Sequence, residues 1–291
     1  MQLLWSLIGV VSMYFLGEAG VFFLLSRIYA FPGGFFRWFL AVHLIFQLII
    51  AAFLLINRDQ FYNCRSGERE NRVNIANKIT LFRISMLPFL IFLLLGVERY
   101  PGKNTGPVLV IAFALTFASD FIDGRLAKTR KIETNIGKIL DSGSDYMLLG
   151  ATAVSFFSFR LIKPWLFWII MGRLFINALG MFILFLIRRK LNPQTTIFGK
   201  AAIAAIMVLF VFEAVPLAGI LPDTRPGRLL PIVIWYLERG VCILILLSVI
   251  DKILYFIKSL RETRRADQST DLRRQKEPKD PYREAIPRQR G

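Results

Sequence analysis

The chain of 291 residues carries 37 Lys and Arg against 20 Asp and Glu, a net charge of +17, yet 55% of its residues are hydrophobic and its mean hydropathy is +0.52. This composition is too apolar for an ordinary soluble domain. Its basic residues are scattered among apolar segments, so they do not form the folded basic domain that nucleic-acid binding needs. We therefore expect a membrane protein that binds no nucleic acid.

Apolar stretches of about 20 residues, the length that crosses a bilayer core of roughly 30 Å, recur along the whole chain. The fourth is short, and the third and sixth each contain an arginine. The first is followed directly by another apolar span and has no basic n-region, so we interpret it as a retained helix and not as a signal peptide. The predicted fold is an all-α polytopic transmembrane helix bundle with spans at 3–25, 36–57, 79–97, 107–121, 139–159, 164–187, 200–221 and 229–257.

The placement of the basic residues predicts the topology. They gather in 65–72, 125–138, 188–190 and again after residue 258, which eight spans would place on one side of the membrane. The positive-inside rule makes that side cytoplasmic, together with both termini. The last segment, 258–291, has 11 Lys or Arg, 6 Asp or Glu and few apolar residues, which predicts a disordered basic tail near anionic headgroups.

Four aspartates are the most informative polar residues. Asp120 and Asp123 are three apart, and Asp141 and Asp145 are four apart, so each pair shares one helix face. The polar and basic residues between the pairs favour a cytoplasmic turn, which would bring all four carboxylates together at the ends of two consecutive helices. A single pair would also fit solvated helix ends, or partners of nearby basic residues.

Clustered carboxylates repel one another unless a positive charge lies between them. Divalent cations that prefer oxygen ligands, Mg²⁺ above all, fit this need. The one histidine, His43, is remote from the aspartates, which disfavours zinc. Metal pairs held by carboxylates are common in phosphoryl chemistry, where a further carboxylate can accept the proton of an attacking hydroxyl.

The pattern D-x2-D-G-x2-A-K-x8-G-x3-D-x3-D at 120–145 resembles the signature of the CDP-alcohol phosphatidyltransferase family, with Lys128 where the family has arginine. Lysine keeps the charge but loses the planar fork that binds phosphate bidentately. "NIANKITLFRISMLP" at 74–88 is similar to the start of the family's first core helix. The resemblance covers about 73–257, a six-helix core, and leaves two additional helices at 1–58, a cytoplasmic linker at 59–72 and the tail at 258–291.

The resemblance implies a homodimeric enzyme that uses two divalent cations, Mg²⁺ or Mn²⁺, bound by Asp120, Asp123, Asp141 and Asp145. It further implies that Asp145 is the general base. The residues that it assigns to the CDP-linked donor are Asn77, Thr80, Gly124, Ala127, Lys128, Thr134 and Gly137.

The reaction that the resemblance implies moves a phosphoryl-linked group from a CDP-linked donor to an alcohol hydroxyl and releases CMP, in the biosynthesis of glycerophospholipids. It favours CDP-diacylglycerol with a small polar alcohol such as glycerol 3-phosphate, at the inner membrane of a bacterium. The alternative is transfer from CDP-choline or CDP-ethanolamine to diacylglycerol. A carboxylate-based ion transporter is a further alternative, which an internal helix repeat would favour.

Charged residues inside the spans need partners or a function. Arg83 lies in the third span, Arg173 in the sixth, and Lys200 at the start of the seventh. We interpret Arg173 and Lys200 as contacts to an anionic acceptor or phosphate. The alternative is that each pairs with Glu213 or Glu238 and stabilises the bundle.

Overall fold

The computed structural model describes residues 1–64, 66–129, 132–188, 197–219 and 225–276. Long α-helices dominate these residues, and the predicted all-α fold is confirmed. Two isolated antiparallel β-bridges are the only strand-like pairings within them. The helices are α1 (Gln2–Ile28), α2 (Gly33–Ile56), α3 (Ile75–Arg99), α4 (Gly106–Thr129), α5 (Asn135–Ser158), α6 (Pro164–Arg188), α7 (Ile197–Ala214) and α8 (Arg225–Lys276).

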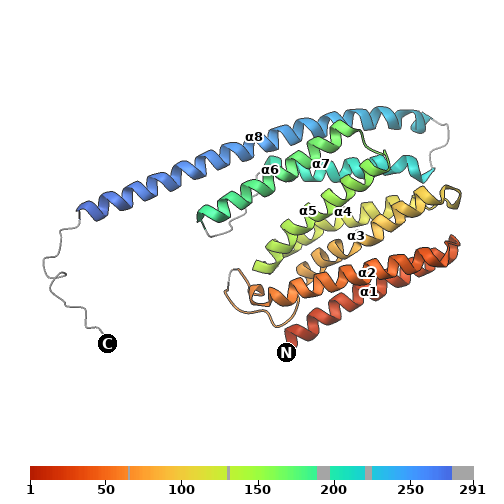
Figure 1. Ribbon diagram of the computed structural model, residues 1–291, viewed down its shortest axis with the longest axis horizontal. Helices are drawn as coiled ribbons and strands as arrows, with labels where there is room; N and C mark the ends of the chain where they lie inside the picture. Colours follow the sequence, from red (N-terminus) through yellow and green to blue (C-terminus); the bar gives the residue numbers. More distant parts are fainter. Residues whose placement is uncertain (65, 130–131, 189–196, 220–224, 277–291) are drawn as a thin grey trace.

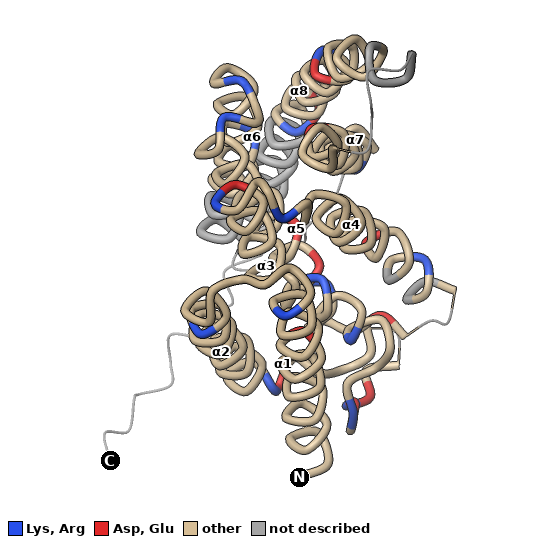
Figure 2. The backbone as a smooth tube through the Cα atoms, turned by 90° about the vertical axis from the view of Figure 1, so that its right-hand side faces the viewer, with Lys and Arg blue, Asp and Glu red and all other residues tan. Residues whose placement is uncertain are grey.

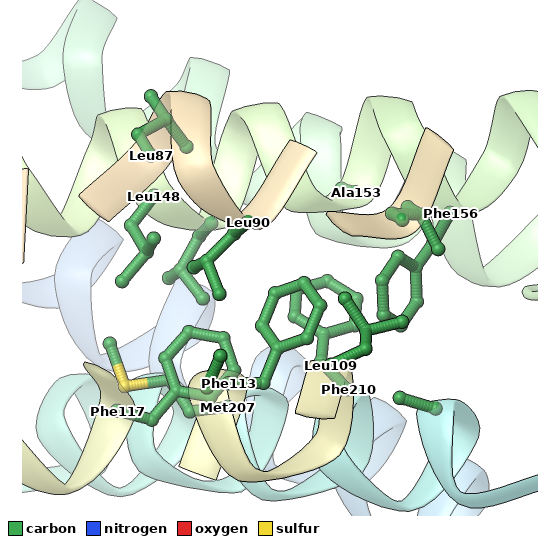
Figure 3. Packing of buried hydrophobic residues seen from close by; sticks show 14 of the residues in the cluster. Leu87, Leu90, Leu109, Phe113, Phe117, Leu148, Ala153, Phe156, Met207 and Phe210 are labelled. Carbon is green, nitrogen blue, oxygen red and sulfur yellow. The ribbon is translucent and has the colours of Figure 1, made fainter. Parts of the chain in front are cut away.

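Helix α3 lies at the centre of the bundle and packs against α1, α2, α4 and α5, whereas α8 covers α6 and α7 (Figure 1). The side chains between these helices form a closely packed apolar core. Aromatic and aliphatic residues of α3, α4, α5 and α7 meet in it, as Figure 3 shows for Leu87, Leu90, Leu109, Phe113, Phe117, Leu148, Ala153, Phe156, Met207 and Phe210.

Six of the described helices are long and apolar enough to cross a bilayer. Charged residues are sparse along their length (Figure 2), and many large apolar side chains point outward, as lipid contact requires. The chain is therefore a multi-pass membrane protein. The N-terminus, the α2–α3 linker, the α4–α5 turn and the C-terminal end of α8 lie toward one end of the bundle (Figure 1), as the distribution of basic residues predicts.

Two elements differ from the sequence prediction. Helix α8 continues to Lys276, whereas we expect disorder from residue 258 onward; no Gly or Pro occurs between 258 and 276, so nothing in that stretch stops the helix. The rest of the predicted tail lies outside the described residues. Helix α4 continues to Thr129, so the segment between the aspartate pairs is mostly helical and not a long turn.

Side-chain caps define where α3 and α5 begin. The Asn74 side chain accepts a hydrogen bond from the backbone N–H of Asn77 (2.9 Å), and the Thr134 hydroxyl accepts one from the N–H of Gly137 (3.1 Å). Each cap pairs an amide that the first helical turn leaves without an intrahelical partner. Both caps lie at the end of the bundle that carries the aspartates.

Candidate active site

Three of the four predicted aspartates converge in space. Asp120 on α4 and Asp141 and Asp145 on α5 each offer a carboxylate oxygen, and these atoms lie within 4.8 Å of one another. Asp120 and Asp145 are largely buried, while Asp141 is 53% exposed. Asp123 follows Asp120 by one turn of α4, and its side chain lies outside the described ones. Three carboxylates at this separation are close enough to bind a single metal ion.

The guanidinium of Arg83, fully buried on α3, lies among these carboxylates. It donates to Asp120, to Asp141 (3.0 Å) and to the hydroxyl of Ser144, and it lies 3.5 Å from Asp145. One cation thus contacts three carboxylates from two helices. The residues therefore provide the charge and the oxygen ligands that a divalent cation needs.

A second cluster joins α3 to the start of α5. The amide of Asn77 donates to the Thr134 hydroxyl (2.9 Å), and that hydroxyl is also within hydrogen-bonding distance of Asn77 Oδ1 (3.1 Å). Both residues are buried. Thr80, also buried, lies one turn further along α3 and donates to the carbonyl of Ala76 (3.2 Å). The structure thus brings Asn77, Thr134 and Gly137 together.

Gly137 has no room for a side chain. A Cβ atom there would lie 2.5 Å from Asn77 Oδ1 and 2.9 Å from Thr134 Oγ1. We expect Gly137→Ala to disrupt this cluster and to lower the free energy of unfolding by about 1–3 kcal/mol. Thermal unfolding in detergent would measure the loss, with Gly143→Ala as the matched control because a Cβ atom at Gly143 meets nothing within 4 Å. Equal melting temperatures of the two variants would contradict the prediction.

The remaining predicted donor residues lie in α4. Gly124 is exposed and a Cβ atom there would meet nothing within 4 Å, so internal packing does not require glycine at this position. Ala127 and Lys128 follow in the same helix, and their side chains lie outside the described ones. The absence of a side chain at Gly124 leaves the helix backbone open to close approach by a ligand.

Arg173 on α6 reaches the start of α7, where Lys200 lies. Arg173 is 2% exposed and donates to the carbonyl of Gly199 (2.9 Å), the residue before the exposed Lys200. It is also near enough to Asp145 for their charges to interact. Among the described residues, neither Arg173 nor Lys200 forms the alternative ion pair with Glu213 or Glu238, and Glu238 instead accepts a hydrogen bond from Lys163 (2.6 Å).

Arg83 is the residue that sequence reasoning did not connect to the aspartates. Its position in the sequence could have indicated this contact, because an arginine within an apolar span needs an anionic partner. A cavity of about 1070 Å³ lies elsewhere, near the opposite ends of α5, α7 and α8. It is lined by residues such as Lys163, Glu213 and Trp235 and by none of the aspartates, so it does not belong to this site.

The fold and the carboxylate cluster define a polytopic membrane protein with three converging carboxylates that could hold a cation. Residues 73–250 match the profile of the CDP-alcohol phosphatidyltransferase family. Because this match covers more than half of the chain, the chain belongs to that family and is an enzyme that transfers substituted phosphate groups. The family assignment decides against the ion transporter that the sequence left open.

Several characterised proteins are similar to this chain. A CDP-diacylglycerol–glycerol-3-phosphate 3-phosphatidyltransferase of Aquifex aeolicus is 32% identical over 181 residues, which cover 62% of this chain and 93% of that protein. An enzyme of the same name from Bacillus subtilis is 32% identical over 35% of this chain and 57% of its own length. A CMP-forming cardiolipin synthase of Streptomyces coelicolor is 26% identical over 47% of this chain and 63% of its own length.

Proposed function

We propose that the protein transfers the phosphatidyl group of CDP-diacylglycerol to a hydroxyl of glycerol 3-phosphate and releases CMP. The convergence of Asp120, Asp141 and Asp145 around one cation position carries this proposal, since these residues stand in the family signature. The two relatives named for this reaction support the choice of donor and acceptor. Arg173 on α6 and Lys200 at the start of α7 support an anionic acceptor over diacylglycerol.

We further propose that the site binds two divalent cations, Mg²⁺ or Mn²⁺, through Asp120, Asp123, Asp141 and Asp145. The fit rests on the position of the Arg83 guanidinium among three of these carboxylates. When bound, such ions would neutralise negative charge on the diphosphate of the donor and on the departing CMP.

In this proposal the side chains of the enzyme bind the substrates and move one proton. The hydroxyl oxygen of the acceptor attacks the phosphorus that carries diacylglycerol, and the bond from that phosphorus to CMP breaks, with its electron pair leaving on CMP. Asp145 takes the hydroxyl proton as general base. The residues proposed to bind the CDP portion of the donor are Asn77, Thr80, Gly124, Ala127, Lys128, Thr134 and Gly137.

Lys200 is proposed, with Arg173, to bind the phosphate of the acceptor. We expect Lys200→Met to raise the KM for glycerol 3-phosphate about tenfold, because one charge-assisted hydrogen bond is lost, and to leave the KM for CDP-diacylglycerol unchanged. Lys103→Met, at the opposite end of the bundle, is the matched control. An unchanged KM for glycerol 3-phosphate would remove Lys200 from the acceptor site.

We also propose that the enzyme is a homodimer in the bacterial inner membrane, with the aspartates and both termini on the cytoplasmic side. The basic residues near that end of the bundle support this orientation. In this arrangement the soluble acceptor arrives from the cytoplasm, while the lipid donor enters from the bilayer.

CMP release by the purified protein in lipid with Mg²⁺ or Mn²⁺ tests the proposed function. CDP-diacylglycerol would be offered with glycerol 3-phosphate and, in parallel, with inositol phosphate, serine or phosphatidylglycerol. CDP-choline and CDP-ethanolamine would be offered with diacylglycerol. We expect turnover with CDP-diacylglycerol and glycerol 3-phosphate. Turnover with another pair alone would reassign the substrates, and no CMP from any pair would overturn the proposal.

A further inference from the structure

The linker between α2 and α3, residues 57–73, packs against the turn that precedes α5, residues 132–134. We propose that this linker braces the turn and thereby positions Thr134 for the nucleotide end of the CDP-linked donor. The inference rests on the proposed function, since it concerns the donor site named there. It assigns a role to a part of the chain that, apart from its last residue, lies before the family match, which begins at residue 73.

Backbone hydrogen bonds join the linker to both sides of Thr134. The N–H of Cys64 donates to the carbonyl of Glu133 (2.8 Å), and the N–H of Asn135 donates to the carbonyl of Tyr62 (3.2 Å). Between them Asn63 and Thr134 form an isolated antiparallel bridge. The side-chain amide of Asn135 also donates to the side-chain carbonyl of Gln60 (2.5 Å). The linker thus lies along the turn as a short added strand.

The linker has a defined shape of its own. It folds back on itself, because the N–H of Asn63 donates to the carbonyl of Glu68 (2.9 Å) and the N–H of Glu70 to that of Phe61 (2.8 Å). The bend contains Gly67, whose φ of +71° lies in the left-handed region that side chains disfavour. The bend therefore depends on glycine at this position.

The two additional helices fix the linker in place. Phe61 is 2% exposed and belongs to a second apolar cluster with Leu7 of α1, Leu54 of α2 and Ile136 of α5. At the other end of the linker, the N–H of Val73 donates to the hydroxyl of Ser6 on α1 (3.0 Å). Helices α1 and α2 therefore provide the base from which the linker reaches the turn.

The turn is held from its other side by the start of α3. The Asn74 amide donates to the carbonyl of Ile132 (2.8 Å), and Asn77 bonds to the Thr134 hydroxyl. Thr134 thus lies between the core helix α3 and the linker. Because a turn held from two sides loses fewer conformations when a ligand binds, removal of one side is expected to weaken donor binding specifically.

Two linker variants test the brace in the full-length protein. Gly67→Val strains the bend, and Gln60→Ala removes the side-chain bond to Asn135. We expect each to raise the KM for CDP-diacylglycerol about fivefold, the effect of one lost hydrogen bond, with kcat and the KM for glycerol 3-phosphate close to wild type. Gly102→Val is the matched control, since Gly102 lies at the opposite end of the bundle and a Cβ atom there meets nothing within 4 Å.

The outcomes separate the inference from the proposed function. Wild-type protein that releases no CMP would overturn the proposed function. Wild-type turnover with an unchanged KM for CDP-diacylglycerol in Gln60→Ala would overturn the brace alone. A fall in kcat without a change in that KM would show a merely structural role, and would also contradict it. If Gly67→Val does not fold, Gln60→Ala alone still tests whether the linker braces the turn.

Discussion

Replacement of Asp145 by asparagine is expected to lower the rate of CMP release by about 10³-fold. Asparagine has nearly the same shape, but it cannot take the proton of the acceptor hydroxyl, and it removes a negative charge from the proposed cation site. The fold should survive, because the change also removes a charge from a crowded set of carboxylates. The measurement is the initial rate of CMP release in lipid with Mn²⁺, beside a thermal unfolding curve.

Glu98→Gln is the matched control, since Glu98 is an exposed carboxylate at the opposite end of α3. It should retain the wild-type rate. If Asp145→Asn released CMP as fast as this control, Asp145 would be neither the general base nor an essential ligand. If Asp145→Asn were slow and also melted at a much lower temperature than wild type, the loss of rate would be attributed to loss of stability.

The positions of the spans along the chain could be predicted from the sequence, because hydropathy and bilayer thickness determine them. Apolar runs predicted every α-helix in the described residues, but the ends of α4 and α8 were wrong. Helix α4 passes residue 121 into a polar stretch with Asp123, Arg125 and Lys128. These residues lower the hydropathy without stopping the helix, so a hydropathy boundary falls short of the structural one.

The aspartates could be found from spacing because residues three or four apart on one helix share a face. What spacing cannot give is how two helices meet, and the site depends on that. Arg83 lies 37 residues before Asp120 and reaches it only because α3 packs between α4 and α5. The same holds for the hydrogen bond between Asn77 and Thr134. Each residue lies at a helix start that the sequence indicates, but their contact depends on how α3 and α5 pack.

The second large effect is expected for a substitution of Arg83. It tests whether the protein needs a positive charge among the clustered carboxylates to be stable. Arg83→Met should lower the free energy of unfolding of the metal-free protein by on the order of 3 kcal/mol, because three carboxylates lose their shared positive partner. Thermal unfolding in detergent, with metal removed by a chelator, measures the loss. Arg99→Met, an exposed arginine at the opposite end of α3, is the matched control.

Added Mn²⁺ should then raise the melting temperature of Arg83→Met more than that of wild type. In the variant the ion replaces the positive charge that Arg83 supplies among Asp120, Asp141 and Asp145, whereas in wild type it shares these carboxylates with a guanidinium that already neutralises part of their charge. Equal increases in both proteins would mean that the ion and Arg83 do not act on the same carboxylates. A melting temperature of Arg83→Met equal to that of Arg99→Met would mean that the buried ion pairs contribute nothing to stability. Because both readouts are independent of turnover, they examine the cation site even if the substrates differ from those proposed.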